Sequence, residues 1–599
     1  MQQADIARIR ATIFGLVGCA YAGEVRVAEG AGLTVACHAQ GARIVCGDLN
    51  ALARGFFLLA QGLAQGQVPF TRTEHRRFTD CGAFLDVSCG AVLTVAAVKR
   101  YIDHMAALGM NLLMLYMEDT YTVPGYPYFG YLRGRYTQEE LRALDDYAAG
   151  MGIELVPAIQ TLGHLNQFLQ WADSAPLRDT PACLLIDEPR TYAFLEAAIT
   201  SLRACVRTRR LHIGMDEAHG VGLGRYHALH GAVDRHALLT RHLARVTALC
   251  QAQGFQPMMW SDMFFRLGSA HNDYYDPEAV VPQAVIDQLP DVDLVYWDYY
   301  HTDEAFYGHM LAQHARMRPR TVFAGGIWTW SGFLPNVALT RATMRPALRA
   351  CARHGVNTVL ATLWGDDSTE TNYFLAASQL PLFSEACWRG ADCADADIEA
   401  AGAFLTGLPA PAYAAFGAFY EGAADRRIGK ALVYADLLYP LLPEPCDLAE
   451  RAAAWHAARR ALAPCLHRAD CRYADALFAL AARKAEVIAP LRARYLAGDR
   501  EHLRRVAAHD IPTLIALTER VADLHKAQWE ADCKRIGWEV LALRYGGLTG
   551  RLRDVQEVLL RWAEGRLARI EELDEVPLPG ASRRGMEFAQ VFMSPSNGY

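Results

Sequence analysis

The chain has 599 residues, which is too long for one hydrophobic core and predicts roughly two to four domains. Its composition, 52% hydrophobic and 21% charged, is that of an ordinary globular protein, and its formal net charge of −7 offers no basic surface to nucleic acid or to an anionic membrane. No apolar run approaches the ~20 residues that cross a bilayer, and the first residues lack the features of a signal peptide. We therefore expect no nucleic-acid partner and no membrane partner.

The cysteines indicate a reducing compartment. Fifteen are scattered singly along the chain, an odd number without any Cys-x-x-Cys pair. This pattern argues against a disulfide framework and against a structural zinc site, because both need closely spaced cysteines. We therefore expect a cytoplasmic protein without a bound metal.

Three domains are predicted in chain order. Residues 1–79 contain two strand-like runs, "GLTVACHA" and "GARIVCG", and one amphipathic helical stretch, which predict a small α/β domain. Residues 80–385 repeat another pattern, in which a helical stretch ends at a glycine and a short apolar run follows. Residues 386–599 contain helical patterns and no strand-like run, and predict an all-helical C-terminal domain.

The middle region predicts an α/β fold, a (β/α)8 TIM barrel. Continuous apolar runs are typical of parallel strands buried on both faces. Eight such runs occur within about 300 residues, the count and length of a barrel in which a helix follows each strand. The runs are Ala83–Ser88, Leu112–Met117, Ile153–Ala158, Leu211–Met215, Gln256–Trp260, Asp293–Trp297, Thr321–Gly325 and Thr358–Leu363. The alternative is an open, doubly wound sheet, although no Gly-x-Gly-x-x-Gly follows the first run.

Acidic and aromatic residues gather where these predicted strands end. In a barrel the active site lies at the carboxyl ends of the strands, so such residues share one mouth. Acids there indicate proton transfer, and indole faces stack on the apolar faces of sugar rings, so a carbohydrate is the expected substrate. The residues are Glu118, Asp119, His164, Asp216, Glu217, Trp260, Trp297, Trp328 and Trp364.

Plainer explanations exist for each of these residues. A single tryptophan at a strand end more often packs in the core, but four at one mouth weaken that explanation. An Asp–Glu pair is usually a solvated surface feature, but Asp216 and Glu217 follow a buried run, where an unused charge is costly. His164 alone could be a hydrogen-bonded structural histidine. A metal site of His212, Asp216 and His219 is disfavoured, because strand alternation would splay these side chains.

The adjacency of Asp216 and Glu217 restricts the mechanism. Two-carboxylate glycosidases place their acids about 5 to 9 Å apart on opposite sides of the scissile bond, which neighbouring residues do not easily do. In a consistent alternative Glu217 protonates the leaving oxygen, and the substrate's own 2-acetamido carbonyl attacks the anomeric carbon. Asp216 would then orient the acetamide and stabilise the oxazolinium intermediate.

The middle region resembles glycoside hydrolase family 20, the β-N-acetylhexosaminidases. The segment "HIGMDEAH" is similar to the family's H-x-G-x-D-E signature. The segments "LDVS", "LYMEDTY", "QTLGHL", "MMWSDMFFRL", "VYWDYY" and "LWGDD" resemble its bacterial, intracellular, exo-acting branch. The resemblance covers residues 80 to 385, and the predicted flanking domains also suit that branch.

This resemblance implies roles at the matching positions. Glu217 matches the general acid and base, Asp216 the carboxylate that polarises the acetamido group, and Asp119 with His164 a pair that supports the acid. Tyr299 or Tyr300 is the candidate for the tyrosine that hydrogen-bonds the acetamido oxygen. The further substrate-binding candidates are Trp297, Trp328 and Trp364 as aromatic walls, Asp366 as the carboxylate that binds sugar hydroxyls, and Glu118 and Trp260 at the same mouth.

The sequence departs from the family at one position. The family usually has an arginine directly after the "LD-x-S" of the first strand, where it binds hydroxyls of the terminal sugar, and this chain has Cys89 followed by Gly90. A charge-assisted contact of that kind contributes about 1.5 to 3 kcal/mol. Either another cation, such as Arg133 or Arg135, replaces the arginine, or the site has relaxed and tolerates both sugar epimers.

The expected function is that of a retaining exo-β-N-acetylhexosaminidase that hydrolyses terminal β-linked GlcNAc or GalNAc. Its partner is then a small oligosaccharide or glycan, with a homodimer as the protein partner left open. No cofactor is implied, because acid catalysis and the substrate's amide supply the chemistry. Two alternatives remain: a catalytically impaired relative that binds sugar, and a glycosidase for a modified hexosamine.

Overall fold

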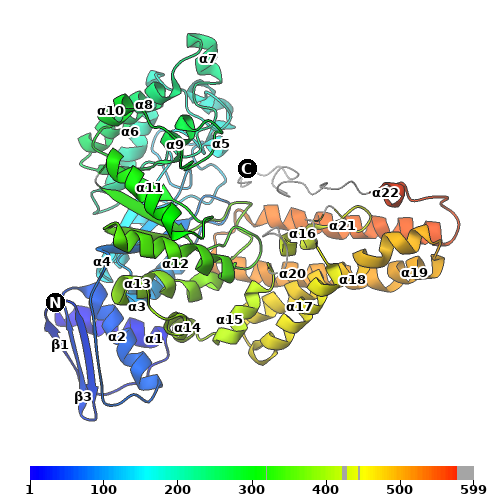
Figure 1. Ribbon diagram of the computed structural model, residues 1–599, viewed down its shortest axis with the longest axis horizontal. Helices are drawn as coiled ribbons and strands as arrows, with labels where there is room; N and C mark the ends of the chain where they lie inside the picture. The colour runs from blue at the N-terminus through cyan, green and yellow to red at the C-terminus, as the bar shows by residue number, and fades with distance from the viewer. Residues whose placement is uncertain (319, 421–427, 441, 443–445, 577–599) are drawn as a thin grey trace.

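The computed structural model describes residues 1–576 except 319, 421–427, 441 and 443–445. Figure 1 shows three parts: an N-terminal sheet with its helices, a barrel surrounded by helices, and long C-terminal helices that extend to one side of the barrel. The end of the predicted C-terminal domain, residues 577–599, lies outside the described residues.

The N-terminal part is a four-stranded sheet with helix α2 (Leu49–Ala64) packed on it and helix α1 (Gln3–Leu16) packed against α2. The strand order is β1 (Val25–Glu29), β3 (Gly41–Cys46), β2 (Leu33–His38) and β4 (Phe70–Glu74). Helix α2 packs against β2 and β3 on one side and against a barrel helix, α3, on the other. Its "FFLLA" run is therefore buried all round, as expected for a helix between two layers.

The middle part is a closed barrel of eight parallel strands, which confirms the predicted (β/α)8 fold and excludes the open sheet. The strands are β5 (Asp80–Asp86), β6 (Leu112–Tyr116), β7 (Glu154–Ala158), β8 (Arg210–His212), β9 (Gln256–Trp260), β10 (Asp293–Trp297), β11 (Thr321–Gly326) and β12 (Thr358–Leu363). The last strand closes the barrel by pairing with the first, with Leu363 opposite Leu85. The strand residues are nearly all buried, which agrees with their continuous apolar runs.

Five strands differ from the predicted ranges: β6, β7 and β11 by one residue at one end, and β5 and β8 by more. Strand β5 begins at Asp80 and ends at Asp86, because the Asp86 carboxylate accepts a hydrogen bond from the Ser88 backbone at 2.8 Å and turns the chain. Strand β8 ends at His212 rather than at Met215. Gly214 has φ 69° and Met215 has φ 74°, values outside the β region, so the strand stops before the catalytic candidates.

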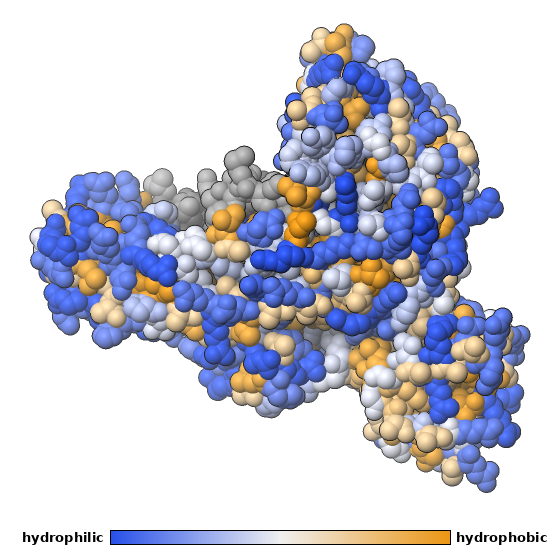
Figure 2. Space-filling view, turned by 180° about the vertical axis from the view of Figure 1, so that it is seen from behind, coloured by the Kyte–Doolittle hydropathy of each residue, from blue (hydrophilic) through white to orange (hydrophobic). Residues whose placement is uncertain are grey.

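Helices surround the barrel as the repeat predicts. They are α3 (Val95–Leu108), α4 (Gln138–Gly150), α6 (Pro189–Arg203), α8 (Arg235–Ala252), α11 (Glu304–Met317), α12 (Val337–Arg353) and α13 (Pro381–Arg389). Helix α3 ends at Leu108 and is capped by Gly109, whose φ of 71° turns the chain toward β6. No helix among the described residues is long and apolar enough to cross a membrane. Figure 2 shows one face of the molecule as mainly hydrophilic, with hydrophobic residues in small scattered groups.

The C-terminal part is helical in the described residues, as predicted. Its helices are α14 (Asp395–Thr406), α15 (Ala410–Gly417), α16 (Ile428–Tyr434), α17 (Leu448–Leu462), α18 (Ala469–Leu496), α19 (Arg500–Arg505), α20 (Ile511–Asp532), α21 (Trp538–Ala563) and α22 (Glu571–Asp574). Ion pairs attach this part to the barrel, such as Lys534 with Glu140 at 2.8 Å. The loop before α21 also packs on the barrel, where Gly537 meets the carbonyl of Gly90 too closely to carry a side chain.

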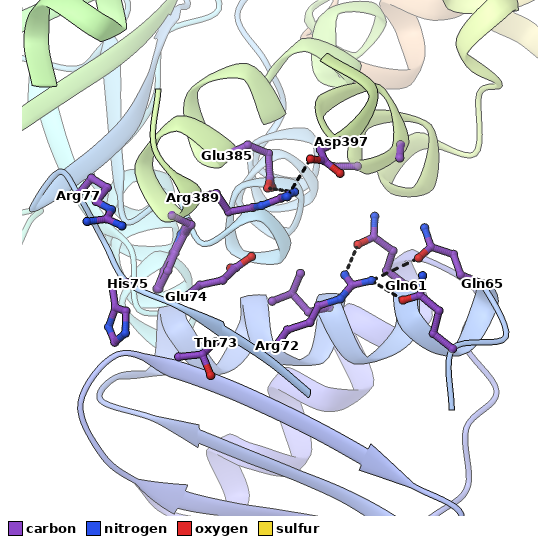
Figure 3. Close-up of a pocket in the computed structure, with 15 residues that line it drawn as sticks. Gln61, Gln65, Arg72, Thr73, Glu74, His75, Arg77, Glu385, Arg389 and Asp397 are labelled. Atoms are coloured by element: carbon purple, nitrogen blue, oxygen red, sulfur yellow. Dashed lines mark hydrogen bonds and ion pairs between the residues drawn. The ribbon is translucent and has the colours of Figure 1, made fainter. Parts of the chain in front are cut away.

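A polar groove of about 690 Å³ separates the N-terminal part from helices α13 and α14 (Figure 3). Two of its arginines are bound by neighbouring side chains: Arg72 donates to three glutamine side chains, and Arg389 donates to Asp397 at 2.8 Å. Beside the groove Arg54 is fully buried and joins Glu74 at 2.6 Å to Glu385 at 3.0 Å. These contacts hold the N-terminal part against the barrel.

Candidate active site

A cavity of about 340 Å³ lies at the carboxyl ends of the barrel strands. Most of the residues selected from the sequence line it: Glu118, His164, Asp216, Glu217, Trp260, Trp297, Tyr299, Tyr300, Trp364 and Asp366. Asp119 and Trp328 are not among its described lining residues. The cavity is also lined by residues that the sequence did not single out as binding groups: Asp86, Tyr116, Trp330, Asp367 and Lys430. Cys89 lies in the same wall.

The adjacent carboxylates meet one histidine. His164 Nε2 lies 3.3 Å from Asp216 Oδ2 and 3.5 Å from Glu217 Oε2. The Asp216 side chain is 12% exposed and the Glu217 side chain 33% exposed, so Glu217 is the more accessible of the two to a ligand in the cavity. One imidazole is therefore placed to hold both carboxylates in fixed positions.

Charges of opposite sign set the protonation of this group. Burial favours the neutral form of His164, but the Asp216 charge and hydrogen bond, followed by the Glu217 charge, raise the pKa of His164 well above its ordinary value. Burial alone would raise the pKa of Asp216, but His164 and a hydrogen bond from Gln160 hold it below its ordinary value. Both shifts favour an imidazolium at His164 beside an ionised Asp216.

Gln160, in the loop after β7, positions Asp216 and was not selected from the sequence. Its Nε2 donates to Asp216 Oδ1 at 2.6 Å and to Tyr116 Oη at 2.7 Å. Its Oε1 accepts the Met215 backbone N–H at 3.1 Å. The amide therefore ties the loop after β8 to strand β6. A single glutamine in "AIQTLGH" carries no pattern that would have indicated this role.

The backbone is strained where the carboxylates emerge. Positive φ angles of non-glycine residues are uncommon, cost roughly 1–3 kcal/mol each and persist only where the surroundings enforce them. Five such residues follow barrel strands: Glu118 (φ 44°), His164 (φ 51°), Met215 (φ 74°), Glu217 (φ 46°) and Asp366 (φ 36°). Four of the five also line the cavity, which indicates that the fold tolerates strain in order to aim these side chains.

Aromatic side chains form much of the remaining wall. Trp297 stacks on Tyr299 with ring centroids 5.4 Å apart, and Trp364 Nε1 donates to Tyr299 Oη at 2.9 Å. Tyr299 is 5% exposed, whereas Tyr300 is 46% exposed. Trp330 lines the cavity, and Trp328 stacks on it at 4.4 Å. In the segment "WTW" the second tryptophan, Trp330, therefore lines the wall, whereas the sequence predicted the first, Trp328.

Two further carboxyl groups in the cavity are easily protonated. Burial raises the pKa of Glu118 to about 8, and its Oε1 accepts a hydrogen bond from Tyr116 Oη at 3.1 Å. Burial, followed by the charge of Asp86, raises the pKa of Asp366 to about 7. Both groups can thus exchange a proton near neutral pH, which changes each from a hydrogen-bond donor to an acceptor.

Neither arginine proposed to replace the family's arginine reaches this cavity. Arg133 is buried, with its Nε 3.2 Å from Asp119 Oδ1 and its Nη2 hydrogen-bonded to the Ser88 carbonyl. Arg135 donates to the carbonyls of Pro127, at 3.0 Å, and Phe129. Among the described lining residues, Lys430, from helix α16, is the only lysine or arginine in the wall that contains Cys89.

Comparison with known proteins identifies the family. Residues 78–282 match the catalytic domain of glycosyl hydrolase family 20, and residues 419–593 match the glycoside hydrolase 20C C-terminal domain. The chain belongs to glycoside hydrolase family 20. The family resemblance predicted from the sequence is thereby confirmed.

Several relatives of this family 20 chain are known. Human hexosaminidase D is 28% identical over 224 residues, which are 35% of this chain and 43% of that protein. The β-hexosaminidase of Akkermansia muciniphila is 25% identical over 264 residues, 37% of this chain and 53% of that protein. The matches thus span about half of these relatives' length. The structure of Flavobacterium johnsoniae chitobiase shares the fold, with a TM-score of 0.52 and 17% identity over 88% of this chain and 93% of that one.

Two more residues of this family 20 site were not selected from the sequence. The Asp262 carboxylate accepts the Glu217 backbone N–H at 2.9 Å, and burial, followed by the charge of Asp216, raises the pKa of Asp262 well above its ordinary value. Tyr274 Oη lies 2.7 Å from His219 Nε2, and burial, followed by the charge of Glu217, raises the pKa of Tyr274. Both residues lie after β9, in α9 (Asp262–Gly268) and the loop that follows it, so only the closed barrel places them beside Glu217.

Proposed function

We propose that the chain is a retaining exo-β-N-acetylhexosaminidase that removes terminal β-linked GlcNAc or GalNAc by substrate-assisted catalysis. The observation that carries this proposal is the group of His164, Asp216 and Glu217, which meet in the cavity at the carboxyl ends of the barrel strands. A volume of about 340 Å³ is small for a ligand pocket and suits one terminal sugar. The family and the names of the curated relatives support the same activity.

Each residue of the group has a distinct task in the proposed reaction. Glu217, the more exposed carboxyl, protonates the glycosidic oxygen as the bond to the leaving group breaks. Asp216, kept ionised by His164 and oriented by Gln160, accepts the acetamido N–H and stabilises the positive charge of the oxazolinium ion. Water then attacks the anomeric carbon while Glu217 accepts its proton, so two inversions give retained configuration.

The aromatic wall provides the binding surface in this proposal. Trp297, Trp330 and Trp364 enclose the acetamido methyl group and the apolar face of the ring. The Tyr299 hydroxyl, buried and fixed by Trp364, is better placed than the exposed Tyr300 to bind the acetamido oxygen. We also assign the chain to the bacterial exo-acting branch that its barrel segments resemble, and to the cytoplasm, since its fifteen cysteines are free.

The test uses 4-nitrophenyl glycosides of GlcNAc, GalNAc and glucose with the purified protein. The proposal requires cleavage of a 2-acetamido sugar, a β product observed first by NMR, and little cleavage of the glucoside. A thiazoline mimic of the intermediate should bind much more tightly than GlcNAc, and Asp216→Asn should weaken that binding together with turnover. Trapping a sugar covalently attached to the enzyme would contradict the mechanism. Tight sugar binding without turnover would favour the impaired relative, and inactivity on both hexosamines with activity on a modified one would favour the third alternative.

A further inference from the structure

One cavity residue comes from outside the barrel. Lys430 lies in helix α16 of the C-terminal part and is 5% exposed, yet it lines the cavity beside Asp366 and Asp367. The aliphatic stem of Lys430 packs against Gly332, in the loop after β11. A Cβ atom added at Gly332 would lie only 3.1 Å from Lys430 Cβ, so the stem is held in place. The ammonium group is thus held at one place in the wall.

A neutral ion network supports this lysine. Lys430 Nζ lies 2.8 Å from Asp367 Oδ2 and 2.7 Å from Glu370 Oε2. Arg544, from helix α21, binds the second oxygen of each carboxylate at 2.6 and 3.1 Å. Two cations therefore balance two anions, which is how a buried charge is retained without a large desolvation cost. The network also ties helices α16 and α21 to the loop after β12.

The ammonium group has one more proton than these partners use. A lysine ammonium has three N–H donors, and among the described residues Asp367 and Glu370 take two of them. The third is available to a ligand in the cavity that Lys430 lines. His164, the other cation among the described lining residues, is engaged by Asp216 and Glu217. Cys89, in the same wall, carries a thiol, which is a weak donor.

We propose that Lys430 is a substrate-binding residue that donates a charge-assisted hydrogen bond to a hydroxyl group of the terminal sugar, with Asp366 as the neighbouring acceptor. The C-terminal helices then complete the sugar pocket of the barrel, and Lys430 supplies the strong donor that Cys89 does not. This assignment rests on the proposed hexosaminidase function, because it concerns recognition of the same sugar. It applies to a neutral hexosamine, since carboxylates outnumber cations in the cavity wall.

The test compares Lys430→Met with Lys484→Met. Lys484 is a matched control: it is a buried lysine of the same C-terminal part, and it donates to the carbonyls of Val433 and Ala435 at 2.7 and 2.8 Å, at the end of α16. The kcat/KM of each protein is measured on 4-nitrophenyl β-GlcNAc and on its 3-deoxy, 4-deoxy and 6-deoxy analogues. Lys430→Met should lose about 10- to 100-fold on the parent sugar, chiefly in KM, and far less on the analogue that lacks the bound hydroxyl. Lys484→Met should leave the ratios between the four sugars unchanged.

An equal loss on all four sugars would overturn the assignment and leave Lys430 a purely structural residue. If Lys430→Met does not fold, Lys430→Arg decides the question, because arginine keeps the two ion pairs but presents its donors differently. A changed parent-to-deoxy ratio then supports sugar contact, and a wild-type ratio rejects it. Calorimetric binding of free GlcNAc separates this proposal from the function. If the wild type cleaves no hexosaminide, the proposed function fails. Weaker binding of GlcNAc by the variant than by the wild type would still support the sugar contact of Lys430, and equal binding would reject it.

Discussion

At the scale of single residues, the proposed acid is the carboxyl that a ligand can reach. Glu217→Gln keeps the shape of the side chain but removes the transferable proton, so turnover of a natural disaccharide should fall at least ~10²-fold. An aryl glycoside with a good leaving group should lose less in the first step, because it needs less protonation. Steady-state kinetics on both substrates check this. A variant that cleaves the disaccharide at the wild-type rate would show that Glu217 is not the acid.

Glu118 should make stability depend on pH. Its pKa of about 8 in the folded protein exceeds its ordinary value of 4.5, so the folded state binds this proton more tightly than the unfolded chain does. The stability that this gives is complete below about pH 4.5 and is lost as the pH rises through about 8. Glu118→Gln should therefore raise Tm relative to wild type by an amount that grows between about pH 5 and pH 8. A Tm difference that stays constant over this range would rule out the shift.

The position of a residue in the cavity wall could be predicted from the sequence where the residue follows closely on a buried apolar run. Asp216 and Glu217 stand out because a charge is unexpected there. Gln160 and Lys430 could not be predicted, since their roles depend on contacts between distant segments. The choice between Trp328 and Trp330 also required coordinates, because strand alternation no longer applies in the loop after β11.

At the scale of elements, the three-residue strand β8 depends on a glycine. An alanine Cβ at Gly214 would overlap the side chain of Gln160, which positions Asp216, in addition to occupying φ 69°. Gly214→Ala should therefore lower kcat/KM roughly ten- to a hundredfold, because small displacements of catalytic groups are costly. Gly254→Ala is the matched control, since its φ is 75° but no atom lies within 4 Å of the new Cβ. It should lose stability without a comparable loss of activity; equal losses of activity in both variants would refute the role of the contact.

The order and number of the barrel elements could be predicted because each buried parallel strand keeps a continuous apolar run. The ends of β9, β10 and β12 also agree with the predicted ranges. The ends of β5 and β8 could not be predicted, because the chain leaves these strands through side-chain contacts and positive φ angles. Asp86 turns the chain after β5 through its hydrogen bond to Ser88, and Met215 follows β8 in the left-handed region. Neither feature has a periodic pattern.

At the scale of the whole molecule, Arg54 links the N-terminal sheet to the barrel. Arg54→Met would leave Glu74 and Glu385 buried without their shared cation, and breaking a buried pair in this way costs about 3 to 5 kcal/mol. Chemical denaturation should show that loss of stability, or should show the N-terminal part unfolding at a lower denaturant concentration than the rest of the protein. Arg26→Met, which breaks an exposed pair with Glu24, should change little. If both variants unfold at the wild-type denaturant concentration, the Arg54 network does not stabilise the docking.

The pocket wall containing Lys430 has a consequence for the engineering of the chain. A segment joined to a barrel merely as a support could be exchanged for another without altering what the barrel recognises. Here the exchange of residues 386–599 would also exchange Lys430 and Arg544, the partners of Asp367 and Glu370. A chimera made at this boundary must therefore carry the loop after β12 together with its matching helices.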